Sequence, residues 1–193
     1  MIALMSGPGF VIFETALGAC ALAWSANGVC GVRFPHPDRG AVAAEARRAW
    51  PQARLLEPPS EVAAVVTDVK ALTAGEPRDF GDVAIDLSGV PDFQRRVYDL
   101  ARAIPCGQTL TYGDVAAQIG APGAARAVGE ALGRNPVPIL VPCHRVLAAG
   151  GRRGGFSAPG GVAAKMRLLQ IEGALALERL PLFAPQASSA SRK

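Results

Sequence analysis

The chain has 193 residues, of which 50% are hydrophobic and 19% are charged, and its formal net charge is +4. This hydrophobic content excludes an intrinsically disordered chain, and no stretch reaches the roughly 18 to 20 apolar residues that a membrane-spanning helix needs. The apolar N-terminal region has no Lys or Arg before Arg33 and is interrupted by Glu14, so it lacks the basic start of a signal peptide. We therefore expect a soluble, cytoplasmic protein.

The first third of the chain is predicted to form strands. Short apolar runs cover three stretches, namely Val11–Thr15, Ala19–Trp24 and Val29–Phe34. The Asn27-Gly28 pair between the last two runs is a strong hairpin signal, and Pro35 and Pro37 predict where the third strand ends. Two helices are expected next, over Ala41–Trp50 and over Ser60–Ala74 with Gly75 as its stop, followed by a polar linker over Gly75–Gly89.

Short helices dominate the second half. An apolar stripe predicts a helix over Asp92–Ala103, Thr111 is the expected cap of a helix over Tyr112–Ile119, and another helix follows over Ala124–Gly133. Two short helices joined by a tight turn that contains glycine are typical of a helix-turn-helix, whose second helix lies in a DNA groove. Helix hairpins that bind no DNA share this pattern, so both interpretations stay open on spacing alone.

Charge divides the chain unevenly. Residues 1–88 carry 7 basic and 10 acidic side chains, a net of −3, whereas residues 89–175 carry 10 basic and 5 acidic ones, a net of +5. The basic part favours a polyanion partner, although ordinary charge scatter on a solvated surface gives a similar pattern. The four cysteines form no C-x-x-C pair and only two histidines accompany them, so we expect no metal and no disulfide framework.

One segment points to nucleophilic chemistry. Pro136, Pro138 and Pro142 exclude a helix over residues 135–146, so Cys143 is expected at the inner end of a buried, extended segment. A buried thiol is usually inert and becomes a nucleophile only when its proton is removed, and His144 is the one histidine nearby. Adjacent residues of an extended chain point to opposite faces, so a contact between the two would need a water relay or a tight turn.

From Phe93 through Gly173 the chain resembles the C-terminal domain of the methylated-DNA–protein-cysteine methyltransferases, also called O6-alkylguanine-DNA alkyltransferases. Its landmarks are TYGDVA at 111–116, AARAVGEALGRNPVPILVPCHRV at 124–146 and KMRLLQIEG at 165–173. The Pro-Cys-His-Arg-Val pentapeptide preceded by Asn-Pro is highly specific to that family. The first half resembles the family's more variable α/β domain in outline only.

The resemblance implies a fold and an activity. Residues 1–88 would form an α/β supporting domain, a ribonuclease H-like small antiparallel sheet with helices, including a linker near 75–88. Residues 89–175 would form a mainly helical catalytic domain with a winged helix-turn-helix-like DNA-binding unit, and residues 176–193 a flexible tail. The implied activity is DNA repair by a monomer: the alkyl group of O6-alkylguanine, with O4-alkylthymine as a second candidate substrate, moves to Cys143 once per molecule and without a cofactor.

The resemblance also assigns DNA-binding roles. The target base lies inside the duplex and must be flipped out. Arg126 matches the residue that fills the vacated stack, and Tyr112 matches the one that presses on the 3′ phosphate. The family's second helix enters the minor groove, and small residues at Ala125, Ala127 and Gly129, with Ala124 before them, suit that close approach. Glu130 departs from this pattern, because phosphate repels a carboxylate.

The remaining implied roles concern the chemistry. His144 would take the proton of Cys143 through a water molecule, Glu172 would orient the far ring nitrogen, and Asn135 would bridge the turn before the active-site segment. Tyr112 would donate a hydrogen bond to the purine as the alkyl group leaves, and Lys165 matches a position that helps to hold the site. The base pocket would comprise Val146, Phe156 and Ser157. Phe156, where many relatives have Tyr, and the Ala158-Pro159 insert put the pocket's shape and its alkyl-size preference in question.

Other classes of protein compete with this interpretation. Alkyltransferase-like proteins bind the damaged base without accepting the alkyl group, but they lack the acceptor cysteine that this chain has. A transcription factor could use the same pair of helices, and the buried Pro-Cys-His segment argues against it. A methyltransferase with a nucleotide cofactor is disfavoured because the sequence has no strand–Gly-x-Gly-x-x-Gly–helix unit.

Overall fold

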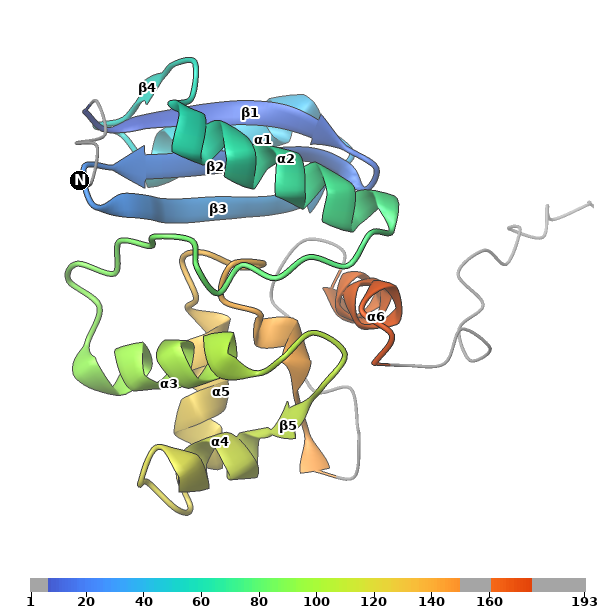
Figure 1. The fold of residues 1–193 in the computed structure, drawn as a ribbon. Helices are drawn as coiled ribbons and strands as arrows, with labels where there is room; N and C mark the ends of the chain where they lie inside the picture. Colours follow the sequence, from blue (N-terminus) through green and yellow to red (C-terminus); the bar gives the residue numbers. More distant parts are fainter. Residues whose placement is uncertain (1–6, 150–160, 175–193) are drawn as a thin grey trace, which may run out of the picture.

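The computed structural model describes residues 7–149 and 161–174 and shows a sheet with its helices packed against a group of short helices (Figure 1). The sheet layer comprises β1 (Gly9–Thr15), β2 (Gly18–Ser25), β3 (Gly28–His36), α1 (Arg39–Ala49), β4 (Arg54–Leu55) and α2 (Ser60–Ala74). The elements that follow are α3 (Asp92–Ala103), β5 (Leu110–Thr111), α4 (Tyr112–Gln118), α5 (Ala125–Gly133), η1 (Cys143–Arg145), β6 (Val146–Leu147) and α6 (Gly161–Ile171). Within the described ranges, no helix has the length and apolar character needed to cross a membrane.

The sheet has the strand order β3-β2-β1-β4 and is mixed rather than purely antiparallel. The pairs β1–β2 and β2–β3 are antiparallel, and the second of them is the hairpin that the Asn27-Gly28 signal predicted. The strand β4 pairs in parallel with β1 through two residues, Arg54 and Leu55. The prediction of an antiparallel sheet is therefore corrected at this edge. Two residues are too few to give an alternating pattern that sequence analysis can detect.

The strand β3 runs two residues beyond its predicted end at Phe34, through Pro35 to His36. It lies at the edge of the four-stranded sheet, where a proline can stand without breaking the ladder because its missing N–H group has no partner to lose. At the other end, Gly28 has a φ of +137°, and a Cβ there would lie 2.5 Å from the carbonyl oxygen of Ala84. The Asn27-Gly28 turn therefore needs its glycine.

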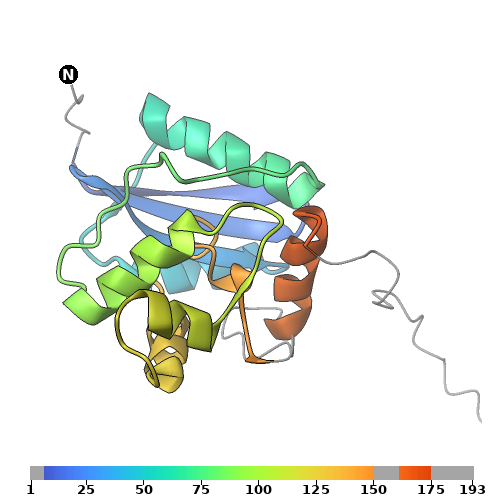
Figure 2. The same ribbon diagram turned by 60° about the horizontal axis from the view of Figure 1, so that its bottom comes forward.

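Alternate residues of β2 face opposite sides of the sheet. Ala21 and Ala23 pack in a small core with α1, whereas Leu22 and Trp24 belong to the larger core that includes α2. Figure 2 shows α2 along one side of the sheet and α3, α4 and α5 grouped below it. The larger core continues into this group and includes the buried segment Val137–Val141. The sheet thus supports the segment that leads to Cys143.

The helix termini largely follow the predicted caps. Helix α2 ends at Gly75, whose φ of +111° is left-handed, and α4 begins with a capping box in which Thr111 and Asp114 exchange hydrogen bonds. Helix α1 begins two residues before its predicted start, because the side chain of Asp38 accepts hydrogen bonds from the first backbone N–H groups. Helix α5 begins one residue later than predicted, at Ala125.

Two sets of contacts join the sheet to the helical group. The backbone N–H of Val32 in β3 donates to the carbonyl of Pro136 at 2.9 Å, directly before the active-site segment. The guanidinium of Arg102 in α3 donates to three carbonyls of the expected linker, those of Phe80, Gly81 and Val83, at 3.2, 2.7 and 2.7 Å. The middle of the linker is therefore held against α3.

Candidate active site

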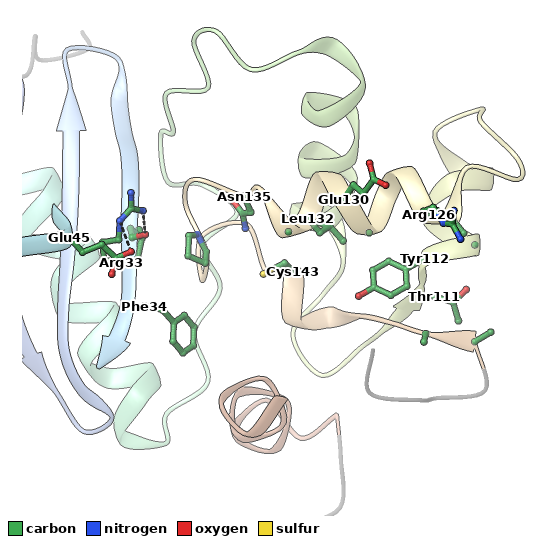
Figure 3. A pocket seen from close by; sticks show the side chains of 18 residues that line it. Arg33, Phe34, Glu45, Thr111, Tyr112, Arg126, Glu130, Leu132, Asn135 and Cys143 are labelled. Atoms are coloured by element: carbon green, nitrogen blue, oxygen red, sulfur yellow. Dashed lines mark hydrogen bonds and ion pairs between the residues drawn. The ribbon is translucent and has the colours of Figure 1, made fainter. Parts of the chain in front are cut away.

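A groove of about 1090 Å³ runs between the edge of the sheet and the pair of helices α4 and α5 (Figure 3). Its walls come from β3, from the start of α4, from one side of α5 and from the segment that carries Cys143. The lining side chains that matter for chemistry are Tyr112, Ala125, Arg126, Gly129, Glu130 and Cys143. The groove therefore brings together residues that are up to 117 positions apart in the sequence, from Val32 to Ala149.

Cys143 begins a tight 3-10 turn, η1, instead of ending an extended segment. The turn forms because the backbone N–H of Arg145 donates to the carbonyl of Pro142 at 2.9 Å. Upstream, Ile139 has a φ of +79°, an unusual conformation for a β-branched residue, which reverses the chain between two buried stretches. The side chain of Cys143 is 8% exposed, so its sulfur is nearly enclosed but faces the groove.

Behind Cys143 lies a buried cluster of three charged or titratable side chains. His144 Nε2 and Glu172 Oε1 are 2.9 Å apart. Arg145 donates to both oxygens of the same carboxylate, from Nε at 3.0 Å and from Nη2 at 2.9 Å, and its Nη1 donates to the carbonyl of Ile104 at 2.6 Å. All three side chains are at least 98% buried. The bidentate arginine fixes the carboxylate that faces the imidazole.

The second ring nitrogen of His144, Nδ1, differs from Nε2 in its surroundings. Nδ1 is buried and has no hydrogen-bond partner among the described residues. Burial lowers the pKa of His144 despite the opposing effect of Glu172, which favours the neutral imidazole. Burial would raise the pKa of Glu172, but the hydrogen bonds from His144 and Arg145 outweigh it and lower that pKa. An ionised Glu172 makes Nε2 the donor, so Nδ1 carries the lone pair.

Asn135 connects α5 to the active-site segment. Its Nδ2 donates to the carbonyl of Val141 at 2.9 Å, and its Oδ1 accepts from the backbone N–H of Val137 at 3.0 Å. Burial raises the pKa of Cys143, whereas a hydrogen bond from Asn135 and the positive charge of Lys165 oppose that rise. The thiol is therefore protonated at neutral pH and needs a base before it can react.

Lys165 and Tyr112 complete the surroundings of the sulfur. Lys165 is 1% exposed, and its Nζ donates to the carbonyl of Val146 at 2.6 Å. That Nζ also lies 5.9 Å from the centre of the Tyr112 ring. Burial raises the pKa of Tyr112, and a charge on Cys143 raises it further, so the phenol keeps its proton. Both side chains remain available as hydrogen-bond donors near the reacting atoms.

Of the predicted DNA-contacting residues on α5, most line the groove. Ala125, Arg126 and Gly129 lie along it, whereas Ala127 is exposed and is not one of its lining residues. Phe156 and Ser157, predicted for the base pocket, and the Ala158-Pro159 insert lie outside the described residues. Val146, the third predicted pocket residue, is fully buried in β6 behind Cys143.

Comparison with known proteins identifies the family. Residues 92–174 match the family model of the 6-O-methylguanine DNA methyltransferase, DNA binding domain. The methylated-DNA–protein-cysteine methyltransferase of Mycobacterium tuberculosis is 48% identical over 125 residues, which make up 65% of this chain and 73% of the relative. The chain belongs to the methylated-DNA–protein-cysteine methyltransferase family. A Salmonella typhimurium member is 54% identical over 96 residues, 50% of this chain and 55% of that protein.

Solved structures of this family extend the similarity to most of the chain. Mycobacterium tuberculosis OGT in complex with DNA matches with a TM-score of 0.69 and 36% identity, over 86% of this chain and 93% of that one. The O6-methylguanine-DNA methyltransferase of Pyrococcus kodakaraensis matches with a TM-score of 0.63 and 31% identity, over 85% and 99% of the two chains. The small mixed sheet and its helices are thus a fold that methyltransferases of this family share.

Arg145 is the site residue that sequence analysis missed. It is the fourth residue of the family's pentapeptide, directly after His144, but an arginine beside a histidine has an ordinary interpretation as an exposed basic residue. The buried position becomes apparent only in the structure, where Arg145 is 2% exposed and paired with Glu172. Its neighbour Glu172, 27 positions away, was assigned from the resemblance alone.

Proposed function

We propose that this protein repairs O6-alkylguanine in DNA by moving the alkyl group to Cys143, once per molecule. The observation that carries the proposal is the position of the Cys143 sulfur. It faces a groove that Arg126 and Tyr112 also line, and the Nδ1 of the adjacent His144 is buried and has no hydrogen-bond partner in the described part of the chain. The name and activity of the relatives agree with this chemistry.

The reaction begins with removal of the thiol proton. The neutral imidazole of His144 accepts the proton at Nδ1 through a water molecule, while Nε2 donates to Glu172. The resulting thiolate attacks the alkyl carbon, the S–C bond forms, and the bond between that carbon and O6 of guanine breaks. The electron pair stays on the purine, which takes up one proton, so guanine and a thioether are the products. No cofactor is required by this balance.

Several residues support the transfer from fixed positions. Arg145 holds Glu172 in place, and Asn135 holds the segment before Cys143 while its hydrogen bond favours the thiolate. Tyr112 donates a hydrogen bond to the purine as negative charge develops there. Lys165 contributes a positive charge near the sulfur and fixes the carbonyl of Val146. The roles of Asn135, Tyr112 and Lys165 follow from the family resemblance, whereas that of Arg145 rests on its contacts with Glu172 and Ile104.

DNA binding is assigned to α4 and α5 as a winged helix-turn-helix-like unit, with α5 as the recognition helix. Arg126 replaces the flipped nucleotide in the stack, and Tyr112 presses on the neighbouring phosphate. Ala125 and Gly129 let the backbone of α5 approach the duplex. Phe156 and Ser157 complete the base pocket together with Val146. The sheet layer, residues 1–88, is assigned to a ribonuclease H-like supporting domain, and residues 89–175 to the catalytic domain.

The protein is proposed to act as a cytoplasmic monomer. The competing function, lesion binding without transfer, is disfavoured because Cys143 occupies the acceptor position and is backed by His144 and Glu172. A transcription factor that used the same helix pair would not need the buried cluster of His144, Arg145 and Glu172.

Mass spectrometry tests the proposal directly. After incubation with a duplex that contains O6-methylguanine, the peptide containing Cys143 is expected to gain one methyl group. The variant Cys143→Ser is expected to gain none, because a serine hydroxyl is far harder to deprotonate, and to keep its affinity for the damaged duplex. A methyl group on another residue, or unmodified protein with intact binding, would contradict alkyl transfer to Cys143.

A further inference from the structure

Glu130 is the only acidic residue of α5, and its position on that helix is unusual for a DNA-binding surface. It is exposed and lines the groove that contains Cys143 and Arg126. In the part of the chain that the structure describes, its carboxylate makes no hydrogen bond and no ion pair. Phosphate would repel such a group, so a DNA-facing carboxylate calls for a donor on the nucleic acid.

The neighbours of Glu130 favour close approach to a narrow groove. Ala125, Gly129 and Gly133 form a stripe of small residues on the side of α5 that lines the groove, a side that also carries the longer side chains of Arg126, Glu130 and Leu132. A helix with full side chains is about 10–12 Å wide and fills the major groove of about 12 Å. Along the stripe of Ala125, Gly129 and Gly133 the helix is narrower, so α5 can approach the minor groove, which is about 6 Å wide before it is opened, with Arg126 and Glu130 beside the stripe.

The minor groove has one type of base-edge donor, the exocyclic N2 amino group of guanine. An ionised carboxylate accepts hydrogen bonds and donates none, so guanine N2 is the base-edge group that matches Glu130 there. We propose that Glu130 accepts a hydrogen bond from N2 of a guanine near the alkylated base and thereby gives the protein a preference for G·C flanking pairs. This inference rests on the proposed function, since it concerns the same DNA complex.

The geometry of α5 predicts how far from the lesion the preferred G·C base pair lies. Glu130 follows Arg126 by four residues, which corresponds to about 6 Å along the helix axis. Base pairs are stacked about 3.4 Å apart, so a residue 6 Å beyond the flipping arginine reaches about two base-pair steps from the alkylated nucleotide. The preference is therefore expected at one position on one side of the lesion.

Inosine provides the test, because it lacks the N2 amino group of guanine and leaves the major-groove edge unchanged. Single-turnover transfer rates are measured on O6-methylguanine duplexes that carry a G·C or an I·C pair one, two or three steps from the lesion, on either side. The wild-type protein is expected to be about tenfold slower with inosine at one of these positions, equivalent to about 1.4 kcal/mol. Glu130→Ala is expected to remove the difference, and Glu130→Gln, whose amide oxygen still accepts, to keep part of it.

The comparison between variants cancels the weaker pairing of inosine, which affects every variant alike. Glu57→Ala is the matched control, because it removes an exposed carboxylate outside the groove and is expected to keep the wild-type preference. Equal wild-type rates with G·C and I·C at every position would overturn the inference, as would a preference that survives Glu130→Ala in protein with unchanged thermal unfolding. Absence of transfer from all duplexes would instead contradict the proposed function.

Discussion

The protonation state of His144 controls whether Cys143 can react. Burial lowers the pKa of this imidazole below its ordinary value of 6.5. Only the neutral ring accepts the thiol proton, so the transfer rate is expected to stay constant as pH falls to 6.5 and to decline at lower pH, as the ring is protonated. Rates of transfer from free O6-benzylguanine, measured from about pH 8 to pH 5, test this expectation without the salt and charge effects of DNA.

The free energy of unfolding, like the transfer rate, should fall as the pH falls. The unfolded chain binds a proton at His144 below pH 6.5, whereas the folded chain resists it, so acid favours unfolding. Glu172 has the same effect on stability at lower pH. Its pKa lies below the ordinary 4.5, so its stabilising contribution to the fold is lost as the pH falls through that lowered value. A transfer rate that already declines between pH 8 and pH 6.5 would contradict control by a His144 whose pKa is lowered.

Arg126→Ala is expected to slow repair of duplex DNA far more than transfer from a free base. If Arg126 holds the stack open, its contribution is the cost of unstacking and unpairing, a few kcal/mol. Each 1.4 kcal/mol corresponds to about tenfold in rate, so a loss of roughly tenfold to a thousandfold is expected on duplex substrate. A free O6-alkylguanine base needs no flipping and should react almost normally.

Glu172→Gln is the control for that experiment. It alters the carboxylate that contacts His144 and Arg145 and leaves α5 untouched, so it should slow both substrates by similar factors. Equal slowing of both substrates by Arg126→Ala would make Arg126 a residue of the pocket or of the fold, and its assignment to flipping would be wrong.

At the scale of elements, the connection between α5 and η1 depends on one side chain. Asn135→Ala removes the partners of the Val141 carbonyl and the Val137 N–H, so the free energy of unfolding should fall by about 1–3 kcal/mol. Transfer should slow as well, because Cys143 loses a hydrogen bond that favours its thiolate. Urea unfolding and single-turnover rates measure the two effects.

The neighbouring exposed residue provides the comparison. Arg134→Ala changes a side chain with no role in the segment and should alter stability by less than about 0.5 kcal/mol. If Asn135→Ala lowered the free energy of unfolding by no more than Arg134→Ala does, the two hydrogen bonds of Asn135 would not be the contacts that stabilise the turn.

Elements with local signals were predictable from the sequence, and those defined by distant partners were not. The Asn27-Gly28 hairpin and the Thr111 cap depend on a few adjacent residues, and both were confirmed. The turn η1 was predicted as extended chain, because nothing near Cys143 shows that Ile139 takes a left-handed conformation. The partnership of Arg145 with Glu172 likewise depends on how α6 packs, which no local pattern encodes.

At the scale of the whole molecule, charge should govern affinity for DNA. The basic side chains of residues 89–175 give this part of the chain a net charge of +5. Binding to phosphates releases condensed counterions, so the logarithm of the affinity should fall linearly with the logarithm of the salt concentration. Fluorescence anisotropy with an undamaged duplex across a salt titration measures the slope. A flat response would exclude electrostatic contact with the phosphates as a main source of affinity.

The hydrogen bond between Val32 and Pro136 also has a consequence for self-association. Strand β3 is an outer strand, and such strands pair readily with strands of other molecules. Here two of its N–H groups are occupied by the chain itself, Val29 by the carbonyl of Ala84 in the linker and Val32 by that of Pro136. The linker and the segment that leads to Cys143 therefore cover this part of the strand and disfavour its pairing with a second copy. Damage that loosens this segment would produce protein that aggregates as well as protein that fails to repair.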